Sequence, residues 1–214
     1  MKILAVDTTS KMCSVALLEN DKIIDEINLD SGLTHSENLM PLVKEILEKN
    51  KVELKDLELI GVDCGPGSFT GIRIGIASVK AIAEVWNLPV AEVTALETLA
   101  RNVETEGVIA SIIDARNNQV YFGVFDKDYN KLEEYLADDI NVIIEKLRKY
   151  DDITIVGDGA ILHQNLICDY IENVSISFVP EQYARNVGYM AYKKYLEKNL
   201  KNADTVMPIY LRNR

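Results

Sequence analysis

Polar residues that could bind a phosphate group or a metal ion follow the first apolar segment of the chain. Residues 2–7 read as a buried strand that ends in Asp7, and Thr8, Thr9 and Ser10 form a polar turn after it. A carboxylate at a strand end could hold Mg²⁺, and the neighbouring hydroxyls could contact phosphate. The same residues could equally cap turns or pair with a nearby cation. Because the turn has no glycine, it offers phosphate no close approach to the backbone.

A second candidate is the loop GPGSFTG at 65–71, which follows an apolar strand at 59–63. It is not a Walker A loop, because it lacks Gly-Lys-Ser/Thr. It also departs from G-x-G-x-x-G, because Thr70 stands where the third glycine should be. We therefore do not expect this loop to hold a nucleotide. Ser68 and Thr70 offer N-cap oxygens instead and predict the start of a helix.

Metal and nucleophilic chemistry find little support in the sequence. The two histidines, His35 and His163, lie in different halves of the chain, and a catalytic zinc site needs about three protein ligands. Ser68 and Cys64 have no histidine near them in the sequence except His35, whose position the sequence leaves open. We expect no metal site and no catalytic residue.

The helix expected at about 71–86 is apolar around most of its circumference. Only Arg73, Lys80 and Glu84 interrupt it, as one narrow polar strip. A helix on the surface of a water-soluble protein normally leaves a broad polar face to solvent. This pattern therefore predicts a helix covered on two sides, by its own sheet and by a second protein chain. The alternative is a central helix enclosed within one domain.

Charge and composition limit the partners of the chain. The formal net charge of the 214 residues is −11, which argues against direct binding of a polyanion. Residues 1–7 are too short an apolar stretch for a signal peptide, and no run of about twenty apolar residues predicts a membrane span. The three separated cysteines fit a reducing compartment, so we expect a cytoplasmic protein with no membrane contact.

The second half of the chain repeats the first. A strand at 108–114 ends in Asp114, as the first strand of the chain ends in Asp7. Each half then has the same order of elements, which is three strands, a helix, a strand and a helix. The pattern predicts an α/β protein of two lobes, 1–105 and 106–214, each with a mixed sheet flanked by helices. Within the second lobe we expect a third strand at 131–136. Whether the last helix packs back on the first lobe stays open.

Five segments together resemble a known family. They are ILAVDTTS at 3–10, HSENLMP at 35–41, the long block at 65–83, Asp114–Arg116 and the tail at 208–212. The chain resembles the TsaB (YeaZ) family, whose fold is a pair of RNase H-like lobes of the actin, hexokinase and Hsp70 type of ATPase. The block GPGSFTGIRIGIASVKAIA is the most specific of these segments.

The resemblance implies a role in a complex. TsaB proteins are non-catalytic partners of TsaD in synthesis of tRNA threonylcarbamoyladenosine (t6A). TsaE, a P-loop ATPase, binds at the TsaB–TsaD junction, and TsaB alone often forms a homodimer through the same surface. Partners would then handle ATP and Mg²⁺, and tRNA would be reached only through the complex. Asp7, Thr8, Thr9 and Ser10 would be vestigial nucleotide contacts.

The resemblance also places the partner interface on the helices at 36–50 and 71–86, although the sequence does not say which face of each helix points outward. A different class of function stays open, an autonomous small-molecule kinase or ATPase of the same fold, and nucleotide binding by the purified protein would distinguish it. The residues expected at the interface are Leu39, Leu42, Val43, Ile46, Ile72, Arg73, Ile76, Val79, Lys80 and Ala83.

Overall fold

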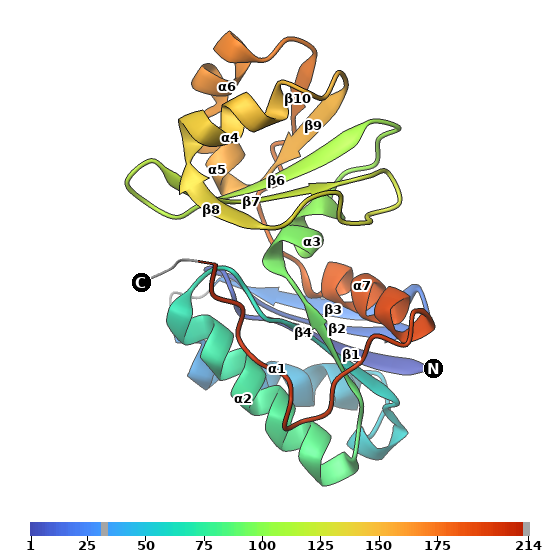
Figure 1. Cartoon of the computed structure of the whole chain (residues 1–214). Coiled ribbons are helices and arrows are strands. Elements are labelled where there is room, and N and C mark those ends of the chain that lie inside the picture. Colours follow the sequence, from blue (N-terminus) through green and yellow to red (C-terminus); the bar gives the residue numbers. More distant parts are fainter. Residues whose placement is uncertain (31–33, 212–214) are drawn as a thin grey trace. The chain divides into compact units, whose positions relative to one another are not determined.

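The computed structural model describes residues 1–30 and 34–211, and it divides into two compact units (Figure 1). The first unit comprises Met1–Thr98 and Gln182–Ile209, and the second comprises Leu99–Glu181 with the described residues after Ile209. The sequence suggested lobes at 1–105 and 106–214. In the structure the last helix belongs to the first unit, which is therefore discontinuous in sequence.

The first unit contains a five-stranded mixed sheet with the order β3-β2-β1-β4-β5. β1 pairs with β2, and β2 with β3, in antiparallel fashion, whereas β1, β4 and β5 run parallel. The parallel strands place their carboxyl ends at one edge of the sheet. The strands are β1 (Lys2–Asp7), β2 (Cys13–Glu19), β3 (Lys22–Leu29), β4 (Leu59–Asp63) and β5 (Val90–Val93).

The second unit repeats this topology. Its sheet has the order β10-β9-β6-β7-β8, with two antiparallel and two parallel pairings in the same succession. The duplicated α/β architecture expected from the sequence is confirmed. The strands are β6 (Val108–Asp114), β7 (Gln119–Phe125), β8 (Leu136–Asp139), β9 (Ile153–Val156) and β10 (Val174–Ile176).

Helices cover both faces of the first sheet, so its central strands are buried on both sides. Ile60 and Val62 of β4 belong to the core beneath α1 and α2. Gly61 points the other way, where an added Cβ would lie 2.8 Å from Ala191 of α7. The helices of this unit are α1 (His35–Lys49), the 3₁₀ turn η1 (Leu54–Asp56), α2 (Phe69–Trp86) and α7 (Ala184–Leu196), and α3 (Ala95–Ala100) begins in this unit and ends in the second.

The second unit differs in detail from the expected elements. The strand expected at 131–136 is wrong: β8 begins at Leu136, opposite Phe122. Asp126 explains the shift, because its carboxylate accepts hydrogen bonds from the backbone N–H groups of Asp128 and Asn130 and holds a turn there. Two short helices follow β9 where the repeated order of elements predicts one. The helices of this unit are α4 (Ile140–Leu147), α5 (Asp158–Leu162) and α6 (Gln164–Tyr170).

The C-terminal segment, 201–209, returns along the first unit. Lys201 exchanges two backbone hydrogen bonds with Val90 of β5, at 2.9 and 2.8 Å. Val206 is fully buried in the same core as α2, and the Ile209 N–H donates to Cys64 O at 2.8 Å. The segment therefore covers the edge of the sheet at β5. Among the described residues, no helix has the length and hydropathy needed to cross a membrane.

Candidate functional site

The helix α2 has one side in the core and the other in solvent. Ser68 caps its N-terminus by accepting a hydrogen bond from the Gly71 N–H, and Asn87 ends it in a left-handed conformation. The inner side packs on the sheet next to α1. The buried residues of α2 are Gly71, Ile72, Gly75, Ile76, Val79, Ile82 and Ala83.

This arrangement corrects the expected interface. Eight of its ten residues are no more than 6% exposed, and all eight belong to the core of the first unit. The 3.6-residue period of α1 and α2 turns them toward β1 and β4, so they cannot also contact a partner. Arg73 is exposed and Lys80 is half-buried. The eight core residues are Leu39, Leu42, Val43, Ile46, Ile72, Ile76, Val79 and Ala83.

The solvent side of α2 carries a row of mainly apolar residues spaced four apart. It consists of Phe69, Arg73, Ala77, Ala81 and Val85, and all five are exposed. Phe69 is 48% exposed and Val85 76% exposed, and the Arg73 guanidinium lies 3.8 Å from the centre of the Phe69 ring. We call this row the outer ridge of α2. Residues four apart line one side of a helix and form the ridges that pack into grooves of another helix.

The turn that the resemblance marks as a vestigial nucleotide site is closed by the protein itself. Asp7, Thr8 and Thr9 are no more than 2% exposed. The Thr8 hydroxyl donates to Gly71 O at 2.7 Å, and the Thr9 carbonyl accepts from the Ser68 N–H at 2.7 Å. Thr9 also donates through its N–H and hydroxyl to Asp7 Oδ1, at 2.8 Å each. The groups that could bind phosphate therefore already hold intramolecular hydrogen bonds.

A buried polar cluster lies behind this turn. Asp63 accepts from the Gly65 N–H at 2.8 Å and from the Thr98 hydroxyl at 3.0 Å, and the Thr9 hydroxyl lies 2.9 Å from Gln182 Oε1. Burial raises the pKa of both Asp7 and Asp63, and the charge of Asp7 raises the pKa of Asp63 further. Sequence reasoning noted Asp63 only as a strand end. It had no signal for Gln182, which lies 173 residues from Thr9.

His35 begins α1 and is half-buried. Its Nε2 lies 2.8 Å from the carbonyl oxygen of Ser10, the last residue of the expected nucleotide turn. His163, by contrast, lies in the second unit, between α5 and α6. Among the residues that the structure describes, no three histidine, cysteine or acidic side chains gather where they could hold a metal ion.

The carboxylates of the second unit act as turn formers. Asp114 Oδ1 accepts from the Arg116 N–H at 2.9 Å, and Asp158 Oδ1 accepts from the Asp114 N–H at 3.0 Å. Burial and the neighbouring charge of Asp114 raise the pKa of Asp158. These contacts agree with the alternative that such residues cap turns.

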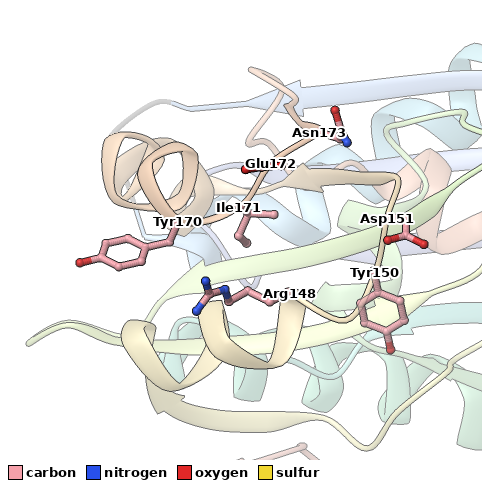
Figure 2. Close-up of a pocket in the computed structure, with 7 residues that line it drawn as sticks. All are labelled: Arg148, Tyr150, Asp151, Tyr170, Ile171, Glu172 and Asn173. Atoms are coloured by element: carbon pink, nitrogen blue, oxygen red, sulfur yellow. The ribbon is translucent and has the colours of Figure 1, made fainter.

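A shallow pocket of about 280 Å³ lies in the second unit, between the end of α4 and the turn from α6 to β10 (Figure 2). Figure 2 shows the rings of Tyr150 and Tyr170 pointing away from each other. The Arg148 guanidinium pairs with Glu145 at 3.0 Å. The lining groups do not converge on a common point, so this pocket is not a candidate active site. It is lined by Arg148, Tyr150, Asp151, Tyr170, Ile171, Glu172 and Asn173.

Comparison with known proteins decides the family. The chain is 33% identical to the tRNA threonylcarbamoyladenosine biosynthesis protein TsaB of Bacillus subtilis, over 99% of this chain and 94% of that protein. The chain belongs to the TsaB (YeaZ) family. A family model described as TsaD, tRNA N6-adenosine threonylcarbamoyltransferase, also matches residues 30–202, so this TsaB-family chain lies within that broader family.

Solved structures agree with this assignment of the TsaB family. A Pseudomonas aeruginosa protein described as similar to the peptidase YEAZ superposes with a TM-score of 0.85, at 25% identity over 99% of both chains. A polyphosphate/ATP-glucomannokinase from Arthrobacter has a TM-score of 0.54 at 8% identity, over 92% of this chain and 99% of that one, and shows the shared fold alone. The two-lobed fold of the actin and hexokinase type is thereby confirmed.

Proposed function

We propose that this TsaB-family chain is a non-catalytic dimerisation subunit in the synthesis of tRNA threonylcarbamoyladenosine. It binds TsaD through the outer ridge of α2, and the pair creates the site for TsaE. Alone, the chain forms a homodimer through the same surface. ATP, Mg²⁺ and tRNA are handled by the partners in the cytoplasm, and this chain reaches tRNA only within the complex.

The outer ridge of α2 carries this proposal. Ala77 and Ala81 are small and lie between larger residues at both ends, so a second helix can approach the middle of α2 closely. Removing the ridge from water would favour association at roughly 25 cal/mol per Å² of apolar surface, before the cost of association is subtracted. An apolar side left in solvent by a single chain is typical of an interaction surface.

Two observations support a non-catalytic role. Asp7, Thr8 and Thr9, which the resemblance marks as vestigial nucleotide contacts, are buried and hydrogen-bonded within the protein. The net charge of −11 disfavours direct tRNA binding, because phosphate contacts require a lysine and arginine surface. A basic partner would supply those contacts.

Charged substitutions on the ridge test the proposal. The double variant Ala77→Arg/Ala81→Arg should weaken binding to TsaD at least about tenfold, measured by light scattering and titration calorimetry, because it places two charges in an apolar contact. The matched control is Leu196→Glu, which is 62% exposed on α7, a helix that packs on the other face of the sheet. Unchanged binding by the double variant would refute the proposed interface. TsaE should bind only when both TsaD and this chain are present.

A further inference from the structure

The start of α2 packs against the turn after β1 through a row of glycines. Gly67, Gly71 and Gly75 are spaced four apart and lie against Thr8 and Thr9. A Cβ added at Gly67 would be 2.4 Å from Thr9 O, and one at Gly71 would be 1.9 Å from Thr8 O. One at Gly75 would be 2.5 Å from the Thr8 hydroxyl oxygen. Only glycines permit this approach, so the start of α2 rests directly on the turn.

The same turn also holds the start of α1. The carbonyl of Ser10 can only accept a hydrogen bond, so His35 Nε2 carries the hydrogen in their 2.8 Å contact. The His35 ring also borders α2, since its Cδ2 lies 3.1 Å from the position of a Cβ at Gly71. The first residue of α1 is therefore fixed between the turn and the first turn of α2.

We propose that Thr8 and His35 are positioning residues for the partner-binding surface. Thr8 holds the start of α2 through its hydrogen bond to Gly71 O, and His35 holds the start of α1 through Ser10 O. The starts of both helices are thereby fixed to the same turn, and this contact determines the position of the outer ridge of α2. This inference rests on the proposed function, and it assigns the turn a role in partner recognition in place of nucleotide binding.

The test uses the full chain and two kinds of measurement. Thr8→Val removes the hydroxyl at nearly constant volume, Thr8→Ser retains it, and His35→Gln removes the ring. Val206→Ala serves as a purely structural control, because Val206 lies in the same core but not at the turn. Affinity for TsaD is measured by calorimetry below each variant's unfolding temperature. Hydrogen exchange of the backbone amides of residues 71–76 is measured without any partner.

We expect Thr8→Val and His35→Gln to bind TsaD at least about fivefold more weakly and to exchange the amides at 71–76 faster. Thr8→Ser should match the wild type in both, and Val206→Ala should lower only the unfolding temperature. Affinities within twofold of wild type for Thr8→Val and His35→Gln would overturn the inference while the proposed function stands. If the wild type does not bind TsaD, the proposed function fails. Unchanged exchange at 71–76 in Thr8→Val would then overturn the positioning role independently.

Discussion

Asp7 and Asp63 end the neighbouring parallel strands β1 and β4, and both carboxyl groups are buried. The strand register pairs Val6 with Val62, so the two acids follow as the next pair. Two negative charges on neighbouring strand ends, away from water, are strongly disfavoured. Burial therefore raises the pKa of both groups, and the charge of Asp7 raises the pKa of Asp63 further.

This pair predicts a pH dependence of stability. A carboxyl whose pKa is raised on folding stabilises the protein fully below its unfolded pKa, near 3.8, and this contribution is lost as the pH rises toward the folded pKa. The loss amounts to about 1.4 kcal/mol per pH unit for one retained proton. In Asp63→Asn the amide needs no proton, so its stability relative to wild type should rise from pH 5 to pH 8. Urea unfolding at each pH measures this difference.

The comparison of the two proteins cancels the titration of the groups that do not interact with Asp63. The side-chain amide oxygen of the Asp63→Asn variant can still accept from the Gly65 N–H, so the hydrogen bond at the strand end is retained. Parallel curves of unfolding free energy against pH for variant and wild type would contradict a raised pKa of Asp63 in the folded protein.

Gly71 offers a second test, because helix propensity and packing predict opposite results. Alanine is favoured over glycine inside helices by about 1 kcal/mol, so propensity alone predicts that Gly71→Ala stabilises α2. The new Cβ would lie 1.9 Å from the Thr8 carbonyl oxygen, which is backbone and cannot move cheaply. We expect a loss of about 3 kcal/mol in the free energy of unfolding. Thr70→Ala, at an exposed neighbouring position, should change it by less than about 0.5 kcal/mol.

Much of the fold could be predicted from periodicity. Apolar runs ending in Asp7, Asp63 and Asp114 marked the buried strands, and the repeated order of elements predicted the duplication. The second hairpin could not be placed, because the hydrogen bonds of Asp126 decide where its turn ends. Local composition alone does not predict where this turn ends.

The site was harder to predict than the fold. The sequence indicated correctly that α2 has apolar residues on two sides, but spacing does not say which side meets the sheet. Ile72 and Ile76 are buried, whereas Ala77 and Ala81 are exposed, and all four suit either environment. The structure therefore predicts that Ile76→Asp unfolds the unit, because Ile76 is only 4% exposed.

Nucleotide binding separates the proposed scaffold from a kinase or ATPase of the same fold. We expect titration calorimetry with Mg²⁺–ATP to give no saturable heat, and the isolated chain to show no ATPase turnover. The physical reason is that Thr8 and Thr9 hold intramolecular hydrogen bonds and are no more than 2% exposed. A robust turnover that Asp7→Asn abolishes would overturn the scaffold proposal in favour of the enzyme.

The C-terminal segment should contribute to the stability of the first unit. Val206 is fully buried against the core that holds α2, whereas its neighbour Met207 is 59% exposed. Val206→Ala leaves a cavity and should lower the free energy of unfolding by about 2 kcal/mol in urea titrations. Met207→Ala should change it by less than about 0.5 kcal/mol, which makes it a matched control.

Truncation of the same segment should lower the free energy of unfolding more than Val206→Ala does. Ending the chain at Asn199 removes the two backbone hydrogen bonds between Lys201 and Val90 and exposes the edge of β5. An unpaired strand edge favours intermolecular pairing, so the truncated chain should also aggregate at concentrations where the full chain does not. Equal unfolding midpoints and equal light scattering for the truncated and full chains would mean that residues 201–209 do not hold α2 and β5 together.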